Sequence, residues 1–130
     1  MSTKNSRILV VDDQFGSRDA LELFLQGEGY ITDSADNGKH ALMLIAERLP
    51  DLIVLDITMP GMDGCELARR LRAGADGTEV LIIALTALGD YNSLERIADA
   101  GFDLYFTKPV APGELYAALN TFAERGRPPA

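Results

Sequence analysis

The chain has 130 residues, enough for one domain with a substantial hydrophobic core. Its apolar content of 47% and charged content of 25% are ordinary for a globular protein. Twenty acidic against twelve basic side chains give a net charge of -8, which disfavours direct binding to nucleic acid or to an anionic membrane.

The cysteine count and the N-terminal sequence indicate the cellular compartment in which the chain is expected. The single Cys65 cannot form an internal disulfide, and one Cys with one His cannot build a zinc site. The apolar run after Arg7 is too short for a signal peptide core or a membrane span. We therefore expect a reducing, cytoplasmic setting.

Apolar runs and apolar residues at helical spacing alternate along the chain. Runs rich in β-branched residues predict strands at 8–11, 30–34, 52–55, 80–85 and 102–106. The runs at 52–55 and 80–85 are typical of strands covered on both faces, whereas the more polar 30–34 is expected near an edge of the sheet. Helical spacing predicts helices over about 15–26, 38–49, 64–73, 94–100 and 112–122. The second of these helices includes Leu49 in its apolar stripe and ends at Pro50.

This alternation predicts an α/β fold with a doubly wound parallel sheet, because short right-handed crossovers leave few other topologies. We assign residues 1–124 to one domain and 125–130, which contain Gly and Pro, to a tail or linker.

Polar side chains follow four of the predicted strands: Asp12 and Asp13, then Asp56, Thr86 and Lys108. The carboxyl ends of parallel strands share one edge of the sheet, so these side chains are expected to gather there. Three carboxylates in one place would repel one another and raise their pKa values unless a cation lay between them. Mg²⁺ suits this set, since it prefers one or two carboxylates, water and often a phosphate oxygen.

The remaining groups are suited to a phosphoryl group. Lys108 offers a point charge to phosphate oxygens, and Thr86 offers a hydroxyl donor. A carboxylate could then act as the nucleophile and form an acyl phosphate. Asp56 is the best candidate because it ends the central strand.

Several motifs in a fixed order resemble the receiver domain of two-component response regulators, over about residues 7–122. They are the acidic pair Asp12-Asp13, the Asp-x-x-x-Pro-x-x-x-Gly pattern of Asp56, Pro60 and Gly64, then Thr86-Ala87 and Lys108-Pro109. The resemblance implies a flavodoxin-like (βα)5 fold with strand order 2-1-3-4-5.

The resemblance also implies roles for the residues at the site. Asp56 would be the phosphoacceptor. Asp13 and Asp56 would bind Mg²⁺ directly together with the backbone carbonyl of Thr58, and Asp12 would help through water. Lys108 would pair with the phosphoryl group.

A switch is implied as well. Thr86 would move toward the phosphate and Tyr105 would turn inward behind it, although Tyr105 covering an edge strand is an open alternative. The Lys108-Pro109 peptide bond is cis in similar proteins. The surface that changes would comprise residues 90–100, 102–106 and 112–123.

Three positions depart from the commonest family pattern or vary within it. Gln14 follows the acidic pair where a third acid is frequent, so the metal pocket is expected to carry less negative charge. Thr58 and Leu88 lie two residues after Asp56 and Thr86, where side chains influence the access of water to the phosphate. The apolar Leu88 cannot hold an attacking water, which predicts a long-lived phosphorylated form.

The partners implied are a histidine kinase or a histidine phosphotransfer protein as donor, and a downstream protein or an attached output domain as receiver of the signal. The chain would catalyse only its own phosphorylation and dephosphorylation. Residues 100–103 and the Pro-rich tail resemble receivers attached to hybrid histidine kinases, and a free-standing regulator is the alternative. A receiver fold used only for protein docking is a second functional hypothesis. A phosphatase would need a second acid where Thr58 stands, and a flavin binder would need a Ser/Thr/Gly-rich loop after the first strand.

Overall fold

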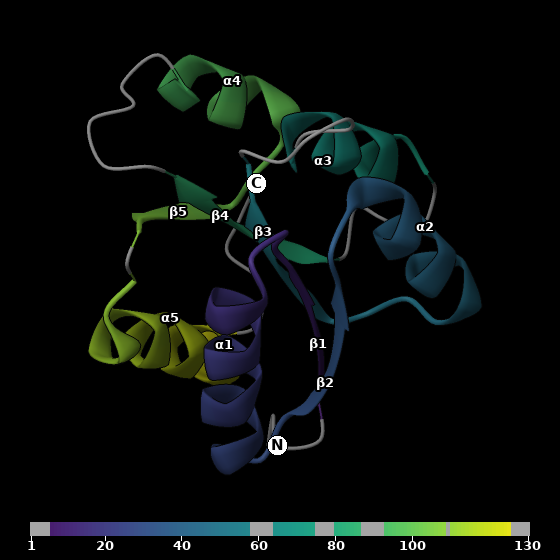
Figure 1. The fold of residues 1–130 in the computed structure, drawn as a ribbon. Helices are drawn as coiled ribbons and strands as arrows, with labels where there is room; N and C mark the ends of the chain where they lie inside the picture. The colour runs from purple at the N-terminus through teal and green to yellow at the C-terminus, as the bar shows by residue number, and fades with distance from the viewer. Residues whose placement is uncertain (1–5, 58–63, 75–79, 87–92, 109, 126–130) are drawn as a thin grey trace.

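The computed structural model describes residues 6–57, 64–74, 80–86, 93–108 and 110–125. These residues form one parallel sheet with strand order β2-β1-β3-β4-β5, and helices alternate with the strands along the chain (Figure 1). The elements in chain order are β1 Arg7–Val11, α1 Phe15–Gly27, β2 Ile31–Ala35, α2 Gly38–Glu47, β3 Leu52–Asp56, α3 Gly64–Ala73, β4 Leu81–Thr86, α4 Ser93–Ala100, β5 Leu104–Thr107 and α5 Pro112–Arg125. The predicted fold class and strand order are confirmed.

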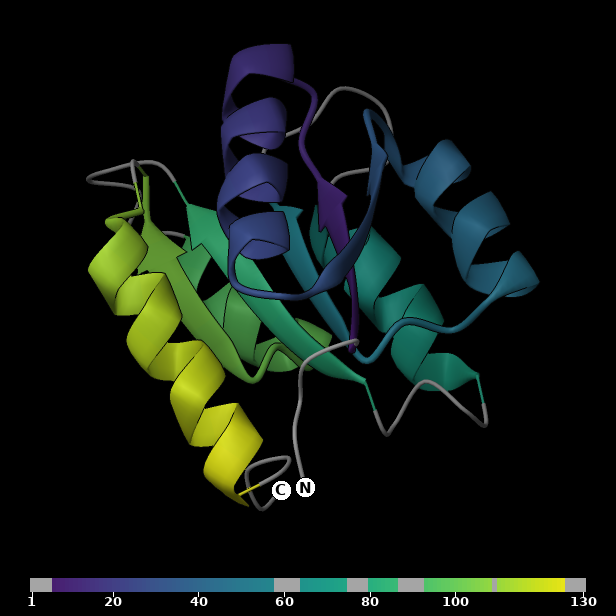
Figure 2. The same cartoon turned by 90° about the horizontal axis from the view of Figure 1, so that it is seen from below.

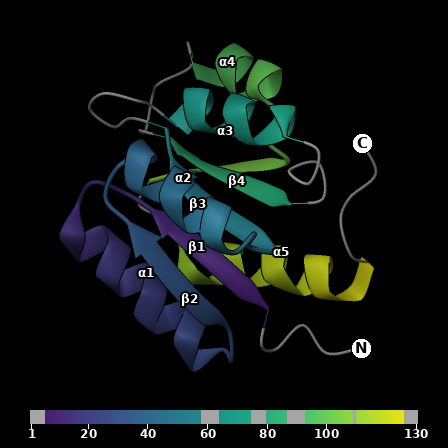
Figure 3. The same cartoon turned by 90° about the vertical axis from the view of Figure 1, so that its right-hand side faces the viewer.

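Helices cover both faces of this sheet. The helices α1 and α5 lie on one face, and α2, α3 and α4 lie on the other (Figures 2 and 3). Side chains of a strand point alternately to the two faces, so β3 serves two cores. Ile53 and Leu55 pack with α2, α3 and α4, whereas Leu52 and Val54 pack with α1 and α5. This double burial explains why the central strands are continuous apolar runs.

The helix α2 is shorter than its sequence pattern predicts. Asn37 caps its start, with the side-chain oxygen accepting a hydrogen bond from the backbone N–H of His40. The helix ends at Glu47, and Arg48 is already extended. Leu49 lies beyond the end and is 38% exposed, so its assignment to the apolar stripe was wrong. The cause is Pro50, whose ring disfavours helical geometry in the residue before it.

The strand β5 begins at Leu104, two residues later than predicted. Gly101 has a φ of 92°, a left-handed conformation that commonly ends a helix. The N–H of Phe102 still donates to the carbonyl of Ile97 in α4 at 3.4 Å. Phe102 is therefore hydrogen-bonded back to α4 and lies between that helix and the strand.

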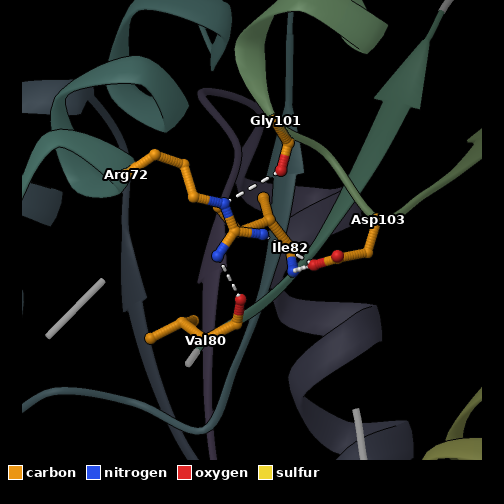
Figure 4. Close-up of polar contacts among 5 residues, drawn as sticks. All are labelled: Arg72, Val80, Ile82, Gly101 and Asp103. Atoms are coloured by element: carbon orange, nitrogen blue, oxygen red, sulfur yellow. Dashed lines mark hydrogen bonds and ion pairs between the residues drawn. The ribbon is translucent and has the colours of Figure 1, made fainter. Parts of the chain in front are cut away.

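A guanidinium group ties the ends of four elements together. Arg72 near the end of α3 donates to the carbonyls of Gly101 at 3.0 Å and Val80 at 2.6 Å, and forms an ion pair with Asp103 at 2.7 Å (Figure 4). The same Asp103 oxygen accepts the N–H of Ile82 at 2.8 Å. A Cβ at Gly101 would lie 3.0 Å from Cγ of Arg72, so the glycine also leaves room for this side chain. The Arg72 network joins α3 and α4 to the starts of β4 and β5.

Among the described residues, no helix combines the length and the apolar character that crossing a bilayer requires.

Candidate functional site

Three carboxylates meet at the carboxyl edge of the sheet. Asp12 directly follows β1, and Asp56 is the last residue of β3. These strands are neighbours with Val11 opposite Leu55, so the register places the two acids side by side. The carboxylates of Asp12, Asp13 and Asp56 each offer an oxygen, and these oxygens lie within 4.8 Å of one another. Asp12 and Asp56 are buried, and Asp13 is exposed.

Lys108, just after β5, is the cation of this site. Its Nζ lies 3.1 Å from Oδ2 of Asp56 and 3.1 Å from Oδ2 of Asp12. Its backbone N–H donates to the carbonyl of Thr86 at 2.7 Å, which fixes the end of β5 beside the end of β4. Burial of the ammonium works to lower the pKa of Lys108, but its close polar contacts with Asp12 and Asp56 and its charge attraction to both together outweigh burial and raise that pKa. Lys108 is therefore firmly cationic at neutral pH.

The charge at this edge is not balanced by Lys108 alone. Lys108 pairs with Asp12 and Asp56, and the carboxylate of Asp13 lies in the same acidic group. The approach of Lys108 to Asp12 is an ion pair without the alignment of a hydrogen bond. Within the described part of the chain, Oδ2 of Asp12 is a buried oxygen with no hydrogen-bond partner. A buried carboxylate oxygen without a hydrogen bond, together with an excess of negative charge, fits a hard cation that prefers oxygen ligands, such as Mg²⁺.

The loop after β1 is held by its own hydrogen bonds. The N–H of Asp12 donates to Ala35 of β2 at 3.2 Å, and Oδ1 of Asp12 accepts the N–H of Gln14 at 2.9 Å. Arg18 of α1 donates from Nη1 to the backbone carbonyl of Asp12 at 2.9 Å. Sequence reasoning missed Arg18, although its place in the helix that follows the acidic pair was a usable signal.

Gly64 brings the start of α3 against the phosphoacceptor candidate. A Cβ at this position would lie 2.6 Å from the backbone oxygen of Asp56 and 2.7 Å from Cα of Ile57, closer than real Cβ atoms come. The N–H of Gly64 donates to the carbonyl of Ile57 at 3.2 Å. The glycine of the Asp-x-x-x-Pro-x-x-x-Gly pattern therefore has a steric reason: only a residue without a side chain allows this approach.

The structure describes two of the remaining predicted residues, Thr86 and Tyr105. Thr86 is buried at the end of β4, in the strand next to Asp56. Tyr105 is 51% exposed on the edge strand β5. Thr58, Leu88 and the Lys108-Pro109 peptide bond involve residues outside those described, so the predictions made for them stand as predictions.

Comparisons with known proteins identify the family to which the sequence is similar. Residues 8–120 match the response regulator receiver domain family. The response regulator MprA of Mycolicibacterium vanbaalenii is 43% identical over 124 residues, covering 94% of this chain and 52% of that protein.

Two solved structures are also similar. The receiver domain of a signal transduction histidine kinase from Syntrophus aciditrophicus has 30% identity and a TM-score of 0.86, covering 96% of this chain and 95% of that one. The receiver domain of a sensor histidine kinase from Pseudomonas aeruginosa, solved with a magnesium ion in its active-site cleft, has 30% identity and a TM-score of 0.84, covering 92% of this chain and 98% of that one.

The chain belongs to the response regulator receiver domain family. It is a receiver domain of the two-component type, and the acidic group Asp12, Asp13 and Asp56 fits the active site of such a domain. The chain spans about half the length of curated response regulators such as MprA.

Proposed function

We propose that Asp56 accepts a phosphoryl group from the phosphohistidine of a histidine kinase or of a histidine phosphotransfer protein. One observation carries the proposal. A buried carboxylate ends the central strand, 3.1 Å from the ammonium of Lys108 and within one cluster with two further acids. Burial and a fixed cation are what a nucleophilic carboxylate needs to receive a highly charged group.

The transfer is a single displacement at phosphorus. A carboxylate oxygen of Asp56 forms the new P–O bond as the P–N bond to the donor imidazole breaks, and the freed imidazole nitrogen takes a proton. The product is an acyl phosphate on Asp56. Lys108 pairs with a phosphoryl oxygen, and the hydroxyl of Thr86 donates to another.

The acids would hold Mg²⁺ during this reaction, with Asp13, Asp56 and the backbone carbonyl of Thr58 as direct ligands and Asp12 acting through water. When bound, the ion neutralises charge on the phosphoryl oxygens. Two observations support this role: the close carboxylate oxygens and the buried Asp12 oxygen without a hydrogen-bond partner. The magnesium ion in the similar Pseudomonas aeruginosa receiver domain adds support.

The signal would leave through the surface formed by α4, β5 and α5. Thr86 would move toward the phosphoryl group, and Tyr105 would turn from its exposed position into the space behind it. The half-exposed ring on an edge strand supports this proposal, since it is free of core packing on that side. If Tyr105 only covers the edge strand, its environment will be the same in both forms.

The proposal also covers the bounds of the domain, its output partner and its cellular setting. Residues 1–124 would form the receiver domain, and 125–130 would lead to a further segment or end free. The output would come from a downstream protein or an attached domain, since curated relatives such as MprA are about twice as long. The chain would act on no outside substrate. A cytoplasmic setting is part of the proposal, supported by the single buried Cys65.

Intact mass after incubation with Mg²⁺ and acetyl phosphate tests this function. We expect the wild type to gain the mass of one phosphoryl group and Asp56→Asn to gain none. Because a small donor does not need the partner surface, a chain that gains nothing is next incubated with a phosphorylated histidine phosphotransfer protein. Failure with both donors would contradict the proposal and favour the docking function.

A further inference from the structure

We infer that Arg18 is a positioning residue for Asp13, the exposed acid of the site. Arg18 lies in the first half of α1, and its Nη1 donates to the backbone oxygen of Asp12 at 2.9 Å. The inference rests on the proposed metal-binding role of Asp13 and adds a residue to it.

The hydrogen bond from Arg18 acts on Asp13 through the peptide unit between Asp12 and Asp13. That unit is planar, so fixing the direction of its carbonyl fixes the direction of the N–H of Asp13 as well. The ψ angle of Asp12 and the φ angle of Asp13 are thereby restricted. Through this peptide unit, Arg18 fixes the position of the backbone N of Asp13.

The following peptide unit is fixed from the other side. The N–H of Gln14 donates to Oδ1 of Asp12 at 2.9 Å, which restricts the ψ angle of Asp13. Asp13 itself is exposed, and in the described part of the chain no hydrogen bond or ion pair holds its carboxylate. Its place in the acidic cluster therefore depends on its backbone, and Arg18 supplies one of the two contacts that hold that backbone.

Phe15 holds the guanidinium in place. The guanidinium carbon of Arg18 lies 5.5 Å from the centroid of the Phe15 ring. That ring is 70% exposed, a position in which a large apolar side chain gains little from burial. The contact between the guanidinium and the ring face limits the conformational freedom of the long Arg18 side chain. Positioning Arg18 is therefore a role for the exposed Phe15.

A positioning role and a purely electrostatic role of Arg18 predict opposite changes in Mg²⁺ affinity when Arg18 is removed. A guanidinium close to the acidic loop repels a divalent cation, so removing its charge alone would tighten Mg²⁺ binding. Loss of the hydrogen bond lets the Asp12-Asp13 peptide rotate, and Mg²⁺ tolerates little deviation of its ligands from octahedral geometry. If Arg18 acts by positioning, its removal weakens Mg²⁺ binding.

The test is a calorimetric titration of the full chain with MgCl2. We expect Arg18→Met to weaken Mg²⁺ binding about tenfold, the effect of removing an outer-shell partner of a metal ligand. Arg18→Lys keeps a charged donor and is expected to fall between Arg18→Met and the wild type. Arg69→Met is the matched control, because Arg69 is exposed on α3 and its removal changes the net charge equally. It should change the affinity by less than about twofold, as expected for a screened surface charge.

A second readout separates positioning from general stability. The three-bond coupling between the N–H and Hα of Asp13, measured by NMR without Mg²⁺, reports its φ angle. In Arg18→Met this coupling should shift toward an averaged value, while thermal unfolding stays close to that of Arg69→Met.

The outcomes distinguish this inference from the proposed function. Unchanged or tighter Mg²⁺ binding by Arg18→Met, with the wild type binding and Asp13→Asn not, would overturn the role of Arg18 and leave the proposed function intact. A wild type that binds no Mg²⁺, or an Asp13→Asn variant that binds it equally well, would overturn both the metal role of Asp13 and the inference.

Discussion

Lys108 couples the charge of the site to the stability of the fold. Removing the ammonium in Lys108→Met leaves the buried carboxylates of Asp12 and Asp56 facing each other without their cation. We expect the free energy of unfolding at neutral pH to fall by ~1–3 kcal/mol, less than for a fully buried pair because Lys108 is partly exposed.

The pH dependence of that difference has a definite sign. The pKa of Lys108 is raised above 10.5 in the folded protein, because its attraction to Asp12 and Asp56 exceeds the opposing effect of burial. Its stabilising contribution is therefore fully present below pH 10.5 and is lost as the pH rises through the higher folded pKa. Urea unfolding of the wild type and Lys108→Met should show a gap in stability that narrows above pH 10.5. A gap that stayed constant through this range would show that the ammonium is not the source.

Gly64 should not tolerate a methyl group without a loss of stability. In Gly64→Ala the new Cβ meets the backbone of Asp56 and Ile57, which cannot move aside as a flexible side chain can. We expect a loss of ~2–3 kcal/mol in the free energy of unfolding, the upper range for overpacking. Gly16→Ala is the control, since a Cβ there meets nothing within 4 Å in α1 and alanine favours helix. Equal urea midpoints for the two variants would refute the close approach at Gly64.

The elements α3, α4, β4 and β5 depend on one another through the Arg72 network. Arg72→Met leaves the carbonyls of Gly101 and Val80 and the carboxylate of Asp103 without the guanidinium. We expect a loss of ~2–4 kcal/mol, since these groups are half-buried or buried. Arg70→Met, which removes only an exposed ion pair with Glu66, should cost ~0–0.5 kcal/mol.

A local measurement decides whether the Arg72 network acts on these elements or on the whole fold. Hydrogen exchange at the N–H of Ile82, which donates to Asp103, should accelerate more in Arg72→Met than exchange at Val54 of β3. Uniform acceleration at both amides would mean that the network adds only global stability.

For the molecule as a whole, local sequence patterns sufficed for the type and order of the elements and for the place of the site, but not for the end of α2 or the start of β5. The run Leu52–Asp56 could be assigned because both of its faces are apolar, and Asp56 could be placed because parallel strands end at one edge. Leu49 was misassigned because apolar residues continue at helical spacing beyond Glu47, where the helix ends ahead of Pro50.

Contacts without a local pattern could not be predicted. Arg72 reaches Gly101 and Asp103, which lie 29 and 31 residues further along the chain, and nothing near Arg72 in sequence marks these partners. Lys108 could be placed at the site from its strand end. Its equal distance from Asp12 and Asp56 follows from the packing of three strands, which only the folded chain determines.

The strand order has a consequence for how the protein is made. Lys108 and Asp56 are 52 residues apart in sequence. The pairing of β1 with β3, which places Asp12 beside Asp56, joins segments that are similarly distant: Arg7 and Asp51 are 44 residues apart. Such long loops close slowly, because their entropy is lost before the contacts form. A chain emerging from the ribosome has Asp56 long before it has Lys108 in place. The contact between Asp56 and Lys108 therefore forms only after the residues up to Lys108 have been synthesised and β5 has joined the sheet.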